Sequence, residues 1–359
     1  QNVRAGVNYN FNFNSIKLEP LKNNDSIFNS KYLKILKDFN INLLPASISI
    51  NTDYIRQFNK QKFREVDLTQ DNIGIQELFR RNYSFDFQLA INYPISENLT
   101  LNYNAANNNI VRNYFVDDEI NGLQDSELDV WDRFFDIGDP NRQVQQIAIN
   151  YDLPLNKIPT FNFLKTTYSY TGDYQWQKGS DLFGNLTLDG QTYDLGNSIS
   201  NANTHNVNSV FDMQKLYRYI GLTKFTRNSD SKSVRGFSNN NQTKKTNPIL
   251  KSIIDLITTV KRIQINYSEN NGSYLPGFLE TPGFIGSFTP SFGYVFGSQR
   301  DIRYLAARNG WLTVFPEFNQ QFSSTKNSNL TFSANLVPIK DLKIDFTGGR
   351  TYAENITES

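Results

Sequence analysis

The residues best placed for chemistry are the acidic side chains between positions 117 and 139 of this chain of 359 residues. Asp125, Glu127 and Asp129 have the alternate spacing of a calcium-binding loop, whose carboxylate oxygens surround the ion. Such a loop needs glycine at its sharp bend and a bidentate glutamate at its twelfth position. Here a valine and Asp136 stand at those places, so we expect a solvated loop or a helix cap rather than bound calcium.

His205 is the single histidine of the sequence, and there are no cysteines. Disulfides, thiolate metal sites and a cysteine nucleophile are therefore excluded, and no second histidine is present to complete a relay. His205 lies in an asparagine-rich stretch, which is typical of a loop. The glycine spacings of phosphate-binding loops do not occur. We therefore expect no enzyme, no cofactor and no metal site.

Charge and hydropathy narrow the class of protein. Lys and Arg number 36 and Asp and Glu number 35, a net charge of +1 that gives no reason to expect a nucleic-acid partner. Mean hydropathy is −0.53 and the sequence contains no apolar run long enough for a transmembrane helix. Yet 14% of residues are aromatic. This combination is typical of an outer-membrane barrel, in which apolar and polar residues alternate.

The clearest alternation runs from residue 83 to residue 93, with large apolar side chains at every odd position. A strand of that length, rising about 3.3 Å per residue and tilted by about 45°, crosses a bilayer core. A strand of a soluble β-sandwich gives the same pattern. The predicted lipid-facing residues are Tyr83, Phe85, Phe87, Leu89, Ile91, Tyr93, Leu101 and Tyr103. The predicted lumen-facing residues are Asp86, Gln88, Asn92, Asn102 and Asn104.

The alternation recurs along the chain, and the connections between strands are asymmetric. Tight turns follow Pro94, Pro154 and Pro338, with a shortened version at Pro45. The opposite connections are long, over roughly residues 55–82, 106–143 and 177–215. Short turns at one rim and long loops at the other are typical of outer-membrane barrels. The predicted fold is therefore all-β: residues 1–359 form about a dozen antiparallel strands in the wall of one much larger transmembrane barrel.

Short helices are expected within the long loops. Asn247 and Pro248 are typical of a helix start, and the apolar stripe that follows predicts an amphipathic helix over 248–260. Further helices are expected near 71–81, 126–135 and 298–310, and a strand near 287–296. Residues 227–247, rich in Ser, Asn and Lys, are expected to form a mobile loop.

The two ends lead us to expect an internal stretch of a longer polypeptide. The sequence begins at Gln1 directly in a strand pattern, without an initiator methionine or a signal segment. It ends in a polar stretch at Ser359, whereas a complete outer-membrane barrel usually ends in an aromatic residue.

Several short motifs follow one another in a characteristic order. They include Leu101-Asn102-Tyr103-Asn104, Leu153-Pro154-Leu155-Asn156-Lys157-Ile158-Pro159, Tyr174-Gln175-Trp176, Leu195-Gly196-Asn197-Ser198, Leu275-Pro276-Gly277-Phe278 and Ala306-Ala307-Arg308-Asn309-Gly310-Trp311. Together they resemble the SprA/Sov family over roughly residues 83–346. The resemblance implies a segment of the type IX secretion translocon, a very large outer-membrane barrel of Gram-negative bacteria.

The resemblance also implies a function and partners. Such a translocon passes folded cargo proteins with a C-terminal signal to the cell surface and supports gliding motility. Its implied partners are a PorV-like outer-membrane barrel protein, a periplasmic plug protein and the cargo, besides membrane lipids. Leu275, Pro276, Gly277 and Phe278 are hypothesised to form a gate or partner-contact loop. The alternatives are a TonB-dependent or porin-type nutrient barrel and a surface β-rich adhesin.

Overall fold

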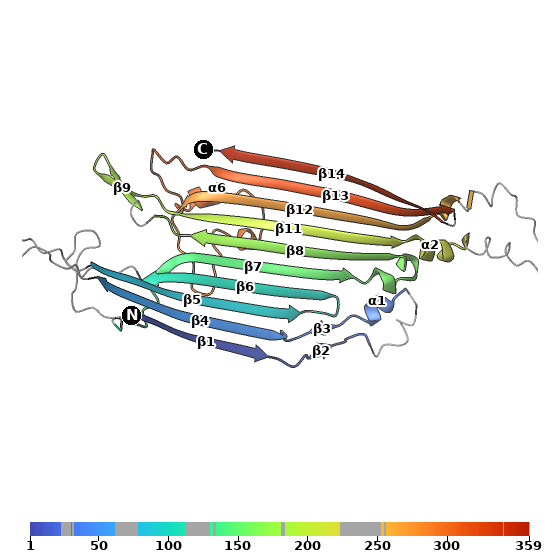
Figure 1. Ribbon diagram of the computed structural model, residues 1–359, viewed down its shortest axis with the longest axis horizontal. Coiled ribbons are helices and arrows are strands. Elements are labelled where there is room, and N and C mark those ends of the chain that lie inside the picture. Colours follow the sequence, from blue (N-terminus) through green and yellow to red (C-terminus); the bar gives the residue numbers. More distant parts are fainter. Residues whose placement is uncertain are drawn as a thin grey trace, which may run out of the picture.

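The computed structural model describes residues 1–22, 30, 32–61, 78–111, 130–131, 134–180, 184–222, 253–254, 256–339 and 341–358. Most of these residues belong to one antiparallel sheet of ten strands, which confirms the all-β prediction (Figure 1). In spatial order the strands are β1 (Asn2–Asn12), β4 (Ser47–Gln61), β5 (Leu78–Pro94), β6 (Leu99–Val111), β7 (Asp139–Leu153), β8 (Leu164–Gln177), β11 (Asn197–Asp212), β12 (Val260–Phe278), β13 (Phe322–Ile339) and β14 (Leu342–Glu358).

Small elements occupy the connections. Two small antiparallel sheets pair β2 (Lys17–Leu18) with β3 (Ile41–Asn42) and, as a hairpin, β9 (Asn185–Leu188) with β10 (Gln191–Asp194). The helices are α1 (Lys34–Lys37), α2 (Met213–Tyr219), α5 (Phe292–Val295) and α6 (Arg303–Arg308), and the 3-10 turns are η1 (Leu155–Lys157) and η2 (Pro159–Phe161). Among the described helices none has the length and apolar character needed to cross a membrane.

The register gives the sheet two chemically different faces. Leu89 lies opposite Ile50 on β4 and Ala105 on β6, while the neighbouring Gln88 lies opposite Asn51 and Ala106. Because successive side chains of a strand point to opposite faces, the apolar sets of neighbouring strands come together on one face and the polar sets on the other.

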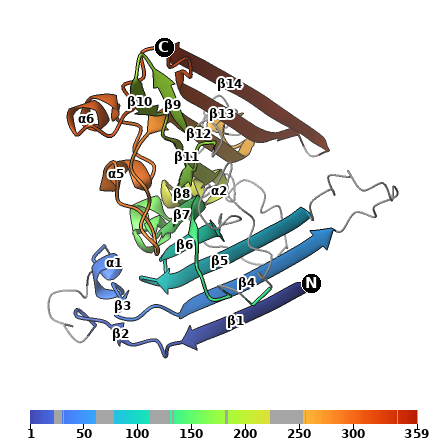
Figure 2. The ribbon, with the colours of Figure 1, turned by 90° about the vertical axis from the view of Figure 1, so that its left-hand side faces the viewer.

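The sheet is curved rather than flat. Seen from the end, its middle strands stand out from the line between β1 and β14, and α5 and α6 lie on the convex side (Figure 2). Side chains of the apolar register contact the segment that contains α5, so the apolar register belongs to the convex face. The polar register therefore lines the concave face.

The connections follow the predicted asymmetry only in part. Tight turns join β5 to β6 and β13 to β14 at one end of the sheet, which we call the tight-turn end. The ends of β4 and β5, β6 and β7, β8 and β11, and β12 and β13 that are joined in sequence meet at the opposite end, which we call the long-loop end. Two longer links join strands that also meet at the tight-turn end: residues 13–46 connect β1 to β4 and contain β2, α1 and β3, and residues 213–259 connect β11 to β12 and begin with α2. The single long connection expected over 177–215 is wrong, because β11 occupies Asn197–Asp212.

Several predicted local elements change. Strand β5 begins at Leu78, so a helix reaching residue 81 is wrong; the alternation that starts there decides for strand. The strand predicted near 287–296 is wrong as well, because Ser291 Oγ accepts the Tyr294 N–H at 3.2 Å and begins α5. The helix predicted over 298–310 is confirmed in part as α6. Of the helix predicted over 248–260, the described residues Ile253, Ile254, Leu256 and Ile257 are helical, whereas Val260 begins β12. Residues 227–247 and most of the helix predicted over 126–135 lie outside the described residues.

Candidate functional site

The concave face is polar along the whole sheet. The five residues predicted to face a lumen all lie on it: Gln88, Asn92 and Asn104 are exposed, and Asp86 and Asn102 are half-buried. Amides and carboxylates on this face bond across strands, as in Asn108 Nδ2 to Asp86 Oδ1 at 2.7 Å and Gln146 Nε2 to Asp173 Oδ1 at 2.7 Å. Such a surface is readily hydrated, because its amides and carboxylates form hydrogen bonds with water as well as with one another.

The convex face carries an apolar belt in its tight-turn half. Leu89, Ile91, Tyr93, Leu101 and Tyr103 are half-buried here, as part of a continuous surface. We define the apolar belt as these five with Ile48, Ile50, Ile147, Ile149, Tyr151, Tyr168, Tyr170, Val207, Ile263, Ile265, Tyr267, Leu330, Phe332, Ile344 and Phe346, which share the face by register.

On the outer strands β13 and β14 the side chains of the belt are exposed. Leu330, Phe332 and Phe346 are 38%, 39% and 58% exposed. Phe332 lies over Gly348, where an added Cβ would be 2.5 Å from the ring. Arg350, opposite Leu330 on β14, brings one charge to the edge of the belt facing the long-loop end. A long side chain of this kind can carry its charge beyond an apolar surface.

The long-loop half of the convex face is covered by the chain itself. Residues 279–299, which we call the strap, lie across β6, β7, β8 and β11 and are held by side-chain amides. Asn201 Nδ2 donates to the carbonyls of Tyr294 at 3.0 Å and Ser298 at 2.8 Å. Further donors to strap carbonyls are Gln143 to Gly283, Gln145 to Ser287, Asn203 to Gly297, Asn107 to Phe284, Tyr170 to Phe296 and Trp176 to Glu280.

Tyr294 anchors the strap from its inner side. Its ring is 1% exposed and stands edge-on to Tyr174, with 6.2 Å between the ring centroids. Burial raises the pKa of the Tyr294 hydroxyl to about 12. The hydroxyl lies 3.2 Å from Ser273 Oγ, and it is the loss of contact with water that disfavours its ionised form.

A second cover buries three residues predicted to face lipid. Tyr83, Phe85 and Phe87 are 0%, 3% and 8% exposed, because Phe284 of the strap and residues 130–131 and 134–136 lie over them. For these three the prediction of a lipid-facing position is wrong: the strands are longer than the apolar belt, and the chain covers the excess.

Arg56 supports this second cover. Its guanidinium is buried and donates to the carbonyls of Phe134 at 2.8 Å and Asp136 at 2.6 Å. It also lies over the rings of Tyr54 and Tyr83, at 5.2 and 4.9 Å from their centroids. Charge-assisted hydrogen bonds and cation–π contacts stabilise a buried guanidinium.

The residues hypothesised to form a gate or partner-contact loop lie at the end of a strand. Leu275, Pro276, Gly277 and Phe278 are the last residues of β12 and are buried. Backbone bonds from Leu279 N to Trp311 O and from Thr313 N to Gly277 O, both 2.8 Å, fix this strand end. The site therefore presents no free surface for a gate or a partner, because the connection after it folds back over it.

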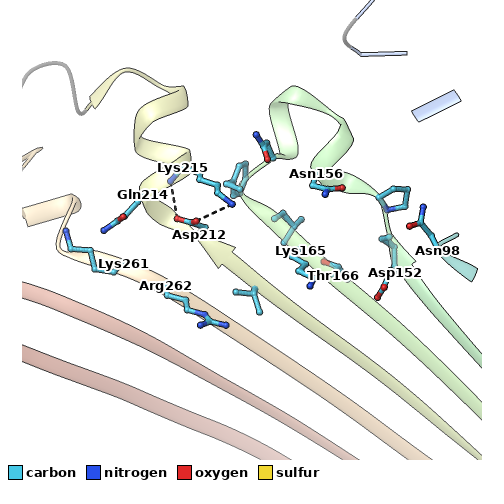
Figure 3. A pocket seen from close by; sticks show the side chains of 16 residues that line it. Asn98, Asp152, Asn156, Lys165, Thr166, Asp212, Gln214, Lys215, Lys261 and Arg262 are labelled. Atoms are coloured by element: carbon cyan, nitrogen blue, oxygen red, sulfur yellow. Dashed lines mark hydrogen bonds and ion pairs between the residues drawn. The ribbon is translucent and has the colours of Figure 1, made fainter. Parts of the chain in front are cut away.

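A cavity of about 680 Å³ opens at the tight-turn end (Figure 3). Lys165, Lys261 and Arg262 bring positive charge to it, and Asp152 and Asp212 bring negative charge. Asp212 is paired with Lys215, whose Nζ is 3.5 Å from a carboxylate oxygen (Figure 3). The residues that line this cavity carry both positive and negative charges, and no nucleophile–base pair is among them.

His205 lies in β11, not in a loop. Its Nδ1 is 2.9 Å from the Tyr168 hydroxyl, and its ring lies 4.9 Å from that of Tyr170. Within the described residues no group of three His, Cys, Asp or Glu side chains could hold a metal ion. Most of the acidic stretch 117–139 lies outside those residues, so a solvated loop or helix cap rather than bound calcium stays a prediction there.

The amides that hold the strap are the functional residues that the sequence pattern alone did not single out. Their signal is an interruption of the apolar register by amides: Asn107 in β6, Gln143 and Gln145 in β7, Asn201 and Asn203 in β11. No protein-family model matches the chain, and no curated protein is significantly similar to it.

Proposed function

We propose that the chain is a wall segment of a large outer-membrane β-barrel that conducts proteins. The observation that carries the proposal is the difference between the two faces of the curved sheet. The concave face is polar on every strand, and the convex face has an apolar belt. In a barrel wall the concave side lines the water-filled lumen and the convex side contacts hydrocarbon.

The height of the belt is close to that of the apolar band of a barrel. A single strand contributes at most three belt residues, and successive belt residues are two residues of rise apart. Three such rows cover about 20 Å along the strand, against about 25 Å for the apolar band of outer-membrane barrels. The rest of each strand continues beyond it toward the long-loop end. There amides replace apolar side chains and the strap covers the face, as expected where a wall leaves the membrane.

The edges of the sheet call for more strands. β1 and β14 each pair with a single neighbour among the described strands, and they present 11 and 17 residues of backbone. Unpaired edges of this length are not stable next to hydrocarbon, so a wall must be continued by further polypeptide. Ten strands are then one part of the circumference, and a lumen that admits folded cargo needs many more than a porin has.

The secretion role is supported by the resemblance to the SprA/Sov family in the motifs between residues 83 and 346. On this reading, cargo with a C-terminal signal passes along the concave face to the cell surface, with a PorV-like barrel protein and a periplasmic plug protein as partners. Neutral amides such as Asn102 and Asn104 suit a passage that binds cargo weakly, because they offer hydrogen bonds to water but no fixed charge.

The test uses matched variants of one strand. Asn102→Leu with Asn104→Leu makes the concave face of β6 apolar, and we expect slower export of cargo while the protein remains in the outer membrane. Leu101→Val with Tyr103→Phe changes the convex face of the same strand and serves as the control. Unchanged secretion in the asparagine variant, or recovery of the chain as a salt-extractable surface protein, would contradict the proposal.

A further inference from the structure

The strap presents an aromatic surface away from the sheet. Phe284, Ile285, Phe288 and Phe292 are 44%, 59%, 64% and 66% exposed. Phe288 stacks on Phe292 with 6.0 Å between ring centroids, and Phe292 lies 4.6 Å from Phe296. A contiguous exposed aromatic patch of this kind marks a surface for a protein or for a membrane.

The scarcity of charged residues in the strap favours a membrane over a protein as the partner of this surface. Glu280 is the single charged residue between positions 279 and 299, whereas 20% of the whole chain is charged. Charged residues return directly after the strap, at Arg300, Asp301 and Arg303. Protein interfaces have a polar and charged rim around an apolar centre, while aromatic side chains without charges are typical of the membrane interface.

Several backbone carbonyls of the strap have hydrogen-bond partners within the protein. An irregular segment next to hydrocarbon must satisfy its polar backbone groups within the protein. The carbonyls of Gly283 and Phe284 are bonded by Gln143 and Asn107, and those farther along by the amides and rings described above. The inner side of the strap is thus hydrogen-bonded, and its outer side is left to the rings.

The aromatic patch is continuous with the apolar belt. Phe296 lies 6.1 Å from Tyr103, a residue at the long-loop side of the belt, and Tyr170 of the belt donates to the Phe296 carbonyl. Figure 2 places α5, which contains Phe292, on the convex side of the sheet.

We propose that the strap lies flat in the membrane interface at the long-loop edge of the belt, with Ile285, Phe288 and Phe292 among lipid headgroups and upper acyl chains. The inference rests on the proposed membrane wall. Strands usually supply the aromatic girdle of a barrel. Here a connection supplies part of it and fixes the depth of the wall in the bilayer.

The experiment places an environment-sensitive fluorophore on single cysteines of the full-length protein reconstituted in phosphatidylcholine vesicles. Residues 1–359 contain no cysteine, and cysteines elsewhere in the full chain are replaced. The probe positions are Phe288→Cys in the strap, Phe332→Cys in the belt and Val314→Cys as a control, 80% exposed in the same connection but beyond the strap. Lipids brominated near the headgroup or deep in the acyl chains act as quenchers.

We expect the probe at 288 to lose fluorescence with shallow bromines more than with deep ones, and the probe at 314 to lose none. A probe at 288 that is quenched by aqueous iodide but not by bromolipid, or that is shielded from both by a bound protein, overturns the inference. The probe at 332 separates the two proposals. Quenching at 332 without quenching at 288 leaves the wall and removes the anchor, and no quenching at 332 removes the wall itself.

Discussion

The side-chain amide of Asn201 donates to the backbone carbonyl of Tyr294 at 3.0 Å, across 93 residues of sequence. The same amide reaches Ser298 at 2.8 Å, and its Oδ1 accepts from Ser273 and Gln299. One asparagine on the convex face thus joins β11 and β12 to the strap, and the part of the sheet beyond the belt depends on such contacts for its cover.

Asn201→Leu should loosen the strap. Asn201 is 3% exposed, so the variant leaves buried carbonyls without donors, at a cost of about 1–3 kcal/mol for each unsatisfied group. We expect faster proteolysis within residues 279–299, with the strands intact. Asn206→Leu on the concave face of the same strand is the matched control, and equal proteolysis of the two variants would contradict the role of Asn201.

Gly172 allows the strap to approach β8. A Cβ at this position would lie 2.5 Å from the Phe296 carbonyl oxygen. Moving the strap away from β8 to make room would break the hydrogen bond from the Tyr170 hydroxyl to the same carbonyl. Gly172→Val should therefore displace the strap, with an overpacking cost of about 1–3 kcal/mol.

The measurement for Gly172→Val is the protection of strap amides from hydrogen exchange. Thr171→Val, which faces the opposite side of β8, is the control and should leave that protection unchanged. Protection that survives in Gly172→Val would show that the contact is looser than the structure indicates.

Tyr294 makes the strap sensitive to alkaline pH. Its pKa is raised by burial from the ordinary value near 10 to about 12, so the folded state favours the neutral phenol. The stability that this provides is fully present below about pH 10 and is lost as the pH rises toward 12. We expect the strap to detach in this window. The Tyr294→Phe variant has no hydroxyl to ionise at this position. The measurement is the difference in tyrosinate absorbance between the two proteins as the pH rises. A difference that titrates near pH 10 would contradict the raised pKa of Tyr294.

The outer edge of β14 should be covered in the intact protein. Alternate amides of β14 point away from β13, and among the described strands none accepts from them. If further polypeptide continues the wall, these amides should exchange as slowly as those bonded to β13. Rapid exchange at alternate positions of β14 in the full-length membrane protein would show a free edge.

Many of the strands were predictable from sequence and the covers were not. Strand β11 is an exception, because its asparagine-rich residues 197–212 lack the apolar alternation and were expected to form a connection. Alternation such as that of Tyr83 to Tyr93 identifies a strand and its two faces, because a side-chain period of two has no other simple cause. Burial of Tyr83, Phe85 and Phe87 depends on residues 130–131, 134–136 and 279–299, which meet the strand only through the tertiary fold. Asn107 and Asn201 read as breaks in an apolar register until the carbonyls they bind are known.

The most direct test of the account compares two arginine variants at adjacent positions of β13. Phe332 lies in the apolar belt and is 39% exposed, whereas Thr331 points to the concave face. If the belt contacts hydrocarbon, Phe332→Arg should lower the stability of the protein in bilayers by about 2–4 kcal/mol, while Thr331→Arg on the wet side should change it by about 0.5 kcal/mol or less. Equal effects of the two substitutions, or a larger effect at position 331, would contradict the assignment of the convex face to the membrane.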